Sequence, residues 1–162
     1  MKKTLLTLVV AFAAAPFSML AGTPISATQL PKAAQTFLSS HFKGDAVVKA
    51  EQDMGKRGTE YEIKLSSGAE IDFNSDGSWK KIEAAYGSTV PSAVVPKGIA
   101  SYVATNFPGV GIKEIEQKRG GYEVDLTNGS ELKLTEEGKP FAPRQGQGQG
   151  GRQQGGRPGK NK

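Results

Sequence analysis

Apolar and polar residues alternate along two neighbouring stretches between residues 60 and 79, with the two-residue period of β-strands. Ile63 and Leu65 alternate with charged residues, and Ile71 and Phe73 do the same after a short turn. A strand with this pattern has one buried face and one polar face. The stretch therefore predicts an antiparallel hairpin with one side against a core.

The same pattern recurs 61 residues later along the chain. Residues 122–126 and 131–134 alternate in the same way, and turns at Asn128-Gly129 and Gly138 follow the two stretches. Self-similarity at a fixed offset is the signature of an internal repeat. We therefore expect two copies of one structural unit.

Apolar residues spaced by three and four predict one helix ahead of each hairpin. Residues 26–42 carry such a stripe, and residues 92–107 carry a second one at an offset of 65. Pro31 and Pro96 fall in the expected first turns, where a missing N–H is tolerated. Both helices should cover the apolar side of a sheet.

One further strand is expected between each helix and its hairpin, at residues 46–53 in the first copy and 110–118 in the second. Residues 53–59 then form a loop four residues longer than its counterpart. A fourth strand is predicted at residues 79–84. Trp79 and Ile82 are three residues apart and would face opposite sides of a regular strand, which indicates a bulge or an early end. The second copy has only residues 139–141 in this place, so its fourth strand is doubtful.

The expected fold class is α+β. Two tandem repeats of one helix plus three or four antiparallel strands would form one continuous antiparallel sheet, with both helices on one face. The expected boundaries are 1–22 for a signal peptide, 23–86 and 87–142 for the repeats, and 143–162 for a tail.

The N-terminus has the order of a secretory signal peptide. Lys2 and Lys3 precede an apolar run at residues 5–15, and small residues follow at Ala21 and Gly22. The run is too short for a membrane span. We expect cleavage near Ala21 or Gly22, a mature chain without a transmembrane segment, and a periplasmic or secreted protein.

Charge and cysteine content change this picture in two ways. The chain has no cysteine, which excludes disulfides and thiolate chemistry. Residues 23–141 hold 14 Lys and Arg against 16 Asp and Glu, whereas the tail carries five basic residues, among them Arg144, Arg152 and Arg157, and no acidic one. The Gly, Gln and Arg composition predicts a disordered tail. The tail either makes weak, salt-sensitive contacts with polyanions or serves only solubility.

The repeated pattern resembles a known family. A helix that opens Leu30-Pro31-Lys32 and closes His41-Phe42 is followed by the strands Tyr61-Glu62-Ile63 and Ile71-Asp72-Phe73, the turn Asp76-Gly77-Ser78-Trp79 and a second copy of the whole. The combination is similar to the PepSY-like proteins called putative beta-lactamase-inhibitor-like, which are exported bacterial proteins. The resemblance covers roughly residues 25–141. It implies a fold similar to the beta-lactamase inhibitory protein, without enzymatic activity, and it transfers no contact residue to this chain.

The polar face of the expected sheet is the first candidate site. A mostly acidic, open sheet face favours basic partners, although an ordinary solvated face has the same composition. Trp79 and Tyr86 lie near its rim by sequence, either as exposed anchors or buried against a helix. The candidate binding residues are Glu60, Glu62, Lys64, Glu70, Asp72, Trp79, Glu123, Asp125, Glu131 and Lys133.

One segment matches the spacing of a calcium-binding loop. Asp72, Asn74, Asp76 and Glu83 occupy ligand positions of an EF-hand, with Gly77 at the turn position. An EF-hand needs a helix on each side, and the segment before Asp72 is a strand by its period. An Asp-Gly hairpin turn flanked by solvent-facing acids explains the same residues. We therefore assign no metal site and keep these four residues as a weak candidate.

Catalytic chemistry finds no support in the sequence. His41 is the single histidine and is expected at a helix end on the surface, and no nucleophile-base arrangement accompanies it. Asn128-Gly129-Ser130 fits a glycosylation sequon, but a hairpin turn explains it. We expect no catalytic residue and no cofactor.

These observations predict an exported, non-catalytic binding module. Its exposed sheet face would recognise an unknown exported protein or peptide and would restrain an envelope hydrolase. The alternative is a calcium- or polyanion-binding envelope protein that acts through residues 72–83 or the basic tail.

Overall fold

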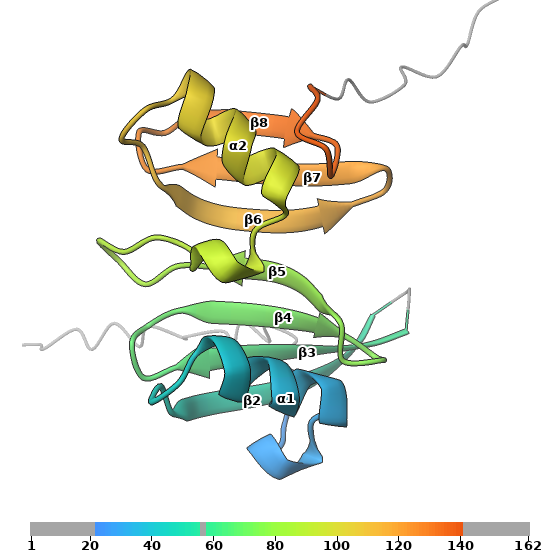
Figure 1. Ribbon diagram of the computed structural model, residues 1–162. Coiled ribbons are helices and arrows are strands. Elements are labelled where there is room, and N and C mark those ends of the chain that lie inside the picture. The colour runs from blue at the N-terminus through green and yellow to red at the C-terminus, as the bar shows by residue number, and fades with distance from the viewer. Residues whose placement is uncertain (1–21, 56–57, 141–162) are drawn as a thin grey trace, which may run out of the picture.

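The structure, a computed structural model, describes residues 22–55 and 58–140. These residues form one antiparallel eight-stranded sheet, two α-helices and two short 3₁₀ helices (Figure 1). In chain order the elements are β1 (Thr23–Pro24), η1 (Ala27–Gln29), α1 (Lys32–His41), β2 (Val47–Gly55), β3 (Gly58–Leu65), β4 (Glu70–Asn74), β5 (Trp79–Glu83), η2 (Ser92–Val94), α2 (Lys97–Asn106), β6 (Ile112–Lys118), β7 (Gly121–Leu126) and β8 (Glu131–Leu134).

The strands follow one another in the sheet in chain order, from β1 to β8. Every neighbouring pair is antiparallel, including β5 and β6, which are separated in sequence by η2 and α2. The α+β class and the single antiparallel sheet are therefore as the sequence predicts. The two-residue strand β1, which pairs with β2, was not expected.

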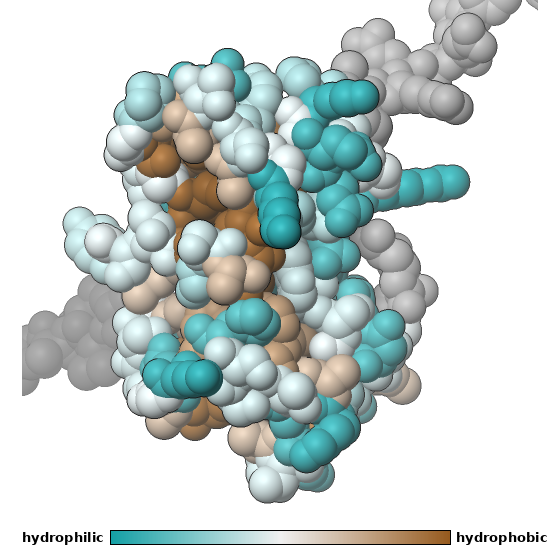
Figure 2. Space-filling view, viewed as in Figure 1, coloured by the Kyte–Doolittle hydropathy of each residue, from teal (hydrophilic) through white to brown (hydrophobic). Residues whose placement is uncertain are grey.

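Both α-helices lie on the same face of the sheet (Figure 1). The fully buried residues Ile63, Ile71 and Phe73 of β3 and β4 belong to the same core cluster as Ala34 and Leu38 of α1. In the second half, buried residues of β6 to β8 join the same cluster with Ile99 and Val103 of α2. From the helix side, apolar surface is visible between the two helices (Figure 2).

The two predicted helices are shorter than the sequence analysis expects. Each expected helix is divided into a 3₁₀ turn and an α-helix, and Pro31 and Pro96 stand at the N-caps rather than inside the first turn. Leu30 and Val95, which precede the prolines, have extended backbone angles with ψ of 150° and 130°. A residue before proline is pushed out of the helical region by the proline ring, so the helix begins after it.

Two other expectations about the strands have clear outcomes. The predicted loop at residues 53–59 is wrong, because β2 and β3 continue as a paired hairpin up to Gly55 and Gly58. The bulge in the fourth strand is confirmed: the pairing of β4 with β5 shifts register between Asp72 and Phe73. The second half has no fourth strand within the described residues. One isolated bridge from Leu134 to Pro140 takes its place.

Turn glycines bring the hairpins against the helices. Gly77, with φ of 82°, lies against the first turn of α1, where an added Cβ would come within 2.9 Å of the Ala34 nitrogen. Gly138, with φ of 79°, lies against α2 in the same way. The second contact is closer, because a Cβ on Gly98 of α2 would overlap the backbone of Glu137. Gly98 is therefore required by packing, although glycine is a poor helix former.

We predict that Gly98→Ala destabilises the protein. Alanine favours a helix interior by about 1 kcal/mol over glycine, but overlap with a backbone costs more, so the free energy of unfolding should fall by about 2 kcal/mol. Urea unfolding followed by the fluorescence of Trp79, the only tryptophan, measures this change. Ser101→Ala, at an exposed position of the same helix, is the control and should shift stability by less than about 0.5 kcal/mol. A Gly98→Ala protein as stable as this control would contradict the packing argument.

Candidate functional site: an acidic sheet face

The sheet face opposite the helices, called the open face below, is covered by charged side chains. Strand register places them on the side away from buried residues such as Ile63, Ile82 and Ile115. The acidic residues of the open face are Glu51, Asp53, Glu60, Glu62, Glu70, Asp72, Glu83, Glu114, Glu116, Glu123, Asp125 and Glu131, and its lysines are Lys49, Lys64, Lys80, Lys81, Lys113, Lys118 and Lys133. Twelve carboxylates against seven ammonium groups give it a formal charge of −5.

Five of these acids form one continuous line across β4 to β8, called the acidic row below. Its members are Glu70, Glu83, Glu114, Asp125 and Glu131, and each faces the next directly in the strand register. Like charges directly opposite one another on a sheet are destabilising. The row is therefore an unfavourable arrangement for folding alone, and it concentrates negative potential along one line of the sheet.

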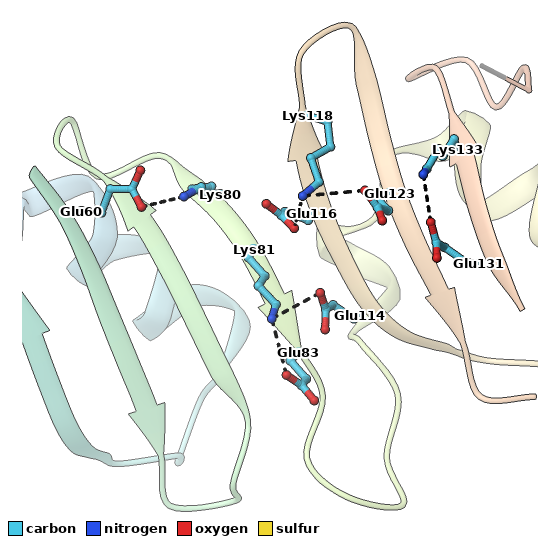
Figure 3. Close-up of polar contacts among 10 residues, drawn as sticks. All are labelled: Glu60, Lys80, Lys81, Glu83, Glu114, Glu116, Lys118, Glu123, Glu131 and Lys133. Carbon is cyan, nitrogen blue, oxygen red and sulfur yellow. Dashed lines mark hydrogen bonds and ion pairs between the residues drawn. The ribbon is translucent and has the colours of Figure 1, made fainter. Parts of the chain in front are cut away.

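Lysines offset part of this repulsion (Figure 3). Lys81 lies between Glu83 and Glu114, with Nζ to carboxylate oxygen distances of 3.7 and 3.3 Å. At one end of the row Lys64 binds Glu70 at 2.7 Å, and at the other Lys133 binds Glu131 at 3.0 Å. Asp125, next to the last residue of β7, makes no ion pair within 4.0 Å among the described residues. Partly exposed pairs of this kind contribute little to stability, so a binding partner can replace them.

An open groove of about 810 Å³ adjoins the acidic row at the ends of the central strands β4 to β7. Glu70 and Glu83 line it together with the loop after β5, Lys113 and Thr127. Tyr86 of that loop is fully exposed, at 107% of its reference area. An aromatic side chain beside a groove that carries acids is suited to anchoring a partner with basic residues.

The environment of two acids raises their pKa. Burial, with a further contribution from Glu62, raises the pKa of Asp72 to about 6, against the attraction of Lys81 and Lys80. Burial also raises the pKa of Glu114, which Lys81 opposes and which Glu83 and Asp125 reinforce. The acids of the open face are thus packed closely enough to disfavour one another's charge.

The segment with calcium-loop spacing folds as a hairpin. Asn74 Nδ2 donates to Ser78 Oγ at 3.0 Å, and Asp76 Oδ1 accepts from the Ser78 amide at 2.8 Å. Glu83 lies opposite Glu70, while Asp72 lies opposite Lys81, so the four candidate ligands do not converge. Within residues 22–55 and 58–140 no group of three or more His, Cys, Asp or Glu side chains is arranged to hold a metal ion.

The sequence analysis listed Trp79 among the open-face candidates and left it either exposed at the rim or buried against a helix; the structure places it on the helix-covered side, so it is not a member of the open face. Its cross-strand partner is Phe73, which is fully buried, and its ring lies 6.1 Å from that of Tyr122 on the helix-covered side. The bulge in β5 causes the difference, because it reverses the parity of the strand before Lys81. All other candidate residues of the face lie where they were expected, and Tyr86 is exposed at its edge.

Other sequence candidates have simpler structural roles. The ring of His41 packs 4.7 Å from that of Phe37 at the end of α1. Asn128 and Gly129 form the predicted hairpin turn, with Asn128 Oδ1 accepting from the Ser130 amide. The signal-peptide residues and tail arginines lie outside the described residues. Neither helix in the described part of the chain is long and apolar enough to span a bilayer.

A comparison with protein families identifies the chain. The model of the family described as "Putative beta-lactamase-inhibitor-like, PepSY-like" matches twice, at residues 18–71 and 59–140. The chain belongs to the PepSY-like family. No curated protein matches this PepSY-like chain.

Solved structures similar to this PepSY-like protein come from Bacteroides. A "putative periplasmic protein" of Bacteroides vulgatus ATCC 8482 is 36% identical over 74% of this chain and 94% of its own, with a TM-score of 0.70. A "putative calcium-regulated periplasmic protein" of Bacteroides thetaiotaomicron is 32% identical over 74% and 94%, with a TM-score of 0.69. A second Bacteroides vulgatus protein, of unknown function, is 32% identical over 72% and 93%, with a TM-score of 0.68.

The sequence analysis missed part of the open face of this PepSY-like protein. Glu114 and Glu116 flank the buried Ile115, and their alternation with it already indicates that they share a face. Their position beside Glu83 depends on the pairing of β5 with β6, which no local pattern predicts. The other missed members are Lys49, Glu51, Asp53, Lys80, Lys81, Lys113 and Lys118. Glu83 was considered only as a calcium ligand.

The raised pKa of Asp72 predicts a pH-dependent stability. The ordinary pKa is 3.8 and the folded value is about 6, so the folded state holds the proton more tightly between these values. The free energy of unfolding should therefore fall as pH rises through this window. Asp72→Asn removes the cost of burying a charged carboxylate at this position. We expect the change to stabilise the protein by about 1–2 kcal/mol at about pH 7.5 and to have little effect at about pH 3. Urea unfolding at the two pH values measures the difference.

Asp76→Asn is the matched control, because the pKa of Asp76 is shifted in the opposite direction from that of Asp72. Hydrogen bonds from the Ser78 hydroxyl and amide lower the pKa of Asp76. The stability that these bonds contribute is present above the ordinary pKa and is lost as pH falls through the folded value. Asp76→Asn should therefore destabilise the protein at neutral pH. Equal responses of the two variants to pH would contradict the assigned environments.

Proposed function

We propose that this protein is an exported, non-catalytic binding module whose open face binds a basic protein or peptide. The acidic row is the observation that carries the proposal. Five carboxylates in direct cross-strand register cost stability, and a partner that supplies basic side chains removes that cost. Electrostatic complementarity of this kind also speeds association and selects against acidic partners.

The similar proteins support the class of function and its location. Two of the solved relatives are described as putative periplasmic proteins, and the order of charged, apolar and small residues at the N-terminus of this chain is that of a signal peptide. The description of the family as beta-lactamase-inhibitor-like supports a role in restraining an envelope hydrolase. The single histidine packs against Phe37, which supports a non-catalytic role.

We also infer that the sheet is built from two tandem repeats, residues 23–86 and 87–142. The two family matches support this division, as does the order of elements, since α1 precedes β2 to β5 and α2 precedes β6 to β8. The paired contacts of Gly77 with α1 and of Gly138 with α2 support it further. A repeat of this kind would make the open face twice as wide as one unit provides.

Charge reversal in the acidic row should abolish partner binding. We expect the immobilised mature chain to capture one partner from native envelope extract in near-stoichiometric amount, identified by mass spectrometry. Glu114→Lys combined with Asp125→Lys should weaken the capture by about tenfold or more, because both changes repel a basic partner. If the partner has hydrolase activity, its rate should fall on addition of the wild-type chain.

Glu136→Lys is the control for this experiment. It reverses one charge, half the change made in the double variant, at an exposed position on the α2 side, where residue 136 lies beside Gly98. Retention of the partner by the double variant, or equal loss in the control, would show that the open face is not the binding surface.

Calcium is the alternative ligand, and the "calcium-regulated" description of the Bacteroides thetaiotaomicron relative favours testing it. Under the present proposal, millimolar calcium should leave the melting temperature unchanged at moderate salt, because the acids of the row are divided among lysines and do not converge. Thermal unfolding with calcium, with magnesium and with a chelator measures this. A rise specific to calcium would favour the alternative, and its loss in Glu83→Gln or Asp125→Asn would assign it to the open face.

A further inference from the structure

The open face is covered by none of the described elements, although its charge and its position beside the last described residues indicate what binds there. Both helices cover the opposite face, and the open face has a formal charge of −5. The segment that follows Pro140 carries five basic residues and no acidic one. We propose that residues 141–162 bind the acidic row of their own chain and compete there with external basic partners.

The direction of the chain at Pro140 favours this occupant. Leu134 is the last residue of β8, and Pro140 bridges to it in an antiparallel sense. A chain that continues in this direction runs back along β8 toward Glu131, the first member of the acidic row on that side. Arg144 lies four residues beyond Pro140 in sequence. A segment that keeps this direction would bring its first arginine to the start of the row.

The segment is also long enough to follow the whole row. From Glu131 on β8 to Glu70 on β4 there are four strand spacings, about 19 Å in total. The thirteen residues from Arg144 to Arg157 span at most about 43 Å when extended. The segment can therefore reach every acid of the row without displacing β8.

The chemistry of the segment suits an occupant that is easily replaced. Arg144, Arg152 and Arg157 are separated only by glycine and glutamine, and no apolar residue lies between them. Arginine binds carboxylates with two parallel hydrogen bonds, and Asp125 has no ion-pair partner among the described residues. Tethering gives such a segment an effective concentration in the millimolar range. Weak contacts then suffice to occupy the row until a stronger partner displaces the segment.

Docking of the segment stands on its own, whereas its competition with partners rests on the proposed function. The two can therefore be tested separately. The chain has no cysteine, so Gln154→Cys in the full mature chain gives a single site for a nitroxide spin label. Backbone amide signals in NMR spectra then report which residues the label approaches, without any knowledge of the partner.

We expect the label to reduce the amide signals of Glu114, Asp125 and Glu131 by roughly twofold or more, and to leave Ser101 and Ala104 of α2 unchanged. About 0.5 M sodium chloride should restore the signals, because it screens the contacts. Arg144→Gln, Arg152→Gln and Arg157→Gln together should also restore them, whereas the three changes to lysine should retain most of the effect. Trp79 fluorescence confirms that each variant is folded.

Three outcomes would overturn the proposal. In the first, the label affects neither face of the sheet or affects both faces equally. In the second, the loss of signal survives neutralisation of the three arginines. In the third, the loss of signal appears in mixtures of labelled chains with separate isotope-enriched chains, which would assign the contact to a second copy. Removal of residues 141–162 should then increase partner capture about tenfold if the segment competes for the row. If the label shows that the segment docks but no partner is captured, the proposed function is contradicted, whereas the binding of residues 141–162 to the acidic row still holds.

Discussion

The pairing of β5 with β6 is the contact on which the rest of the structure depends. It consists of three residue pairs, and the central one joins Ile82 to Ile115, both fully buried. Without this pairing the chain would form two small sheets, each with one helix and a small core, and small cores are marginally stable. With it, eight strands share one hydrophobic core and expose one continuous polar face. The same three pairs also bring Glu83 opposite Glu114, so the pairing of β5 with β6 both unites the sheet and completes the acidic row.

Local patterns predicted the elements of this fold well, because each depends on its own residues. The alternation in β3, β4 and β7 identified the strands, and the faces of Glu62 and Asp125 followed from it. What the sequence left open or missed depends on contacts between distant parts of the chain. The side of Trp79 was left open, because the bulge in β5 that brings it to the helix side is fixed by the pairing with β4. The neighbourhood of Glu114 could not be predicted either, since it depends on a strand pair separated by a helix.

The acidic row shows a compromise between folding and recognition. A sheet designed for stability alone would alternate charges across strands, as Asp72 and Lys81 do in the neighbouring line. In the acidic row Glu83 is compensated instead by Lys81, two residues away on the same strand, and by Lys113 of the neighbouring β6, each at 3.7 Å. Burial of Asp72 adds to the cost by raising its pKa. Such local strain is tolerable because the shared core on the other side of the sheet is continuous.

The two lateral edges of the sheet restrict how a partner can attach. At one edge β1 covers the middle of β2 and ends with Pro24, and at the other Pro140 bridges to Leu134 of β8. Proline has no N–H to offer, so neither segment presents a full ladder of donors to an incoming strand. Growth of the sheet by addition of a further strand from another molecule is therefore disfavoured. Recognition is left to side chains, whose attraction is screened by ions. Under the proposed function, the ionic strength of the surrounding compartment would directly control how strongly the open face holds a partner.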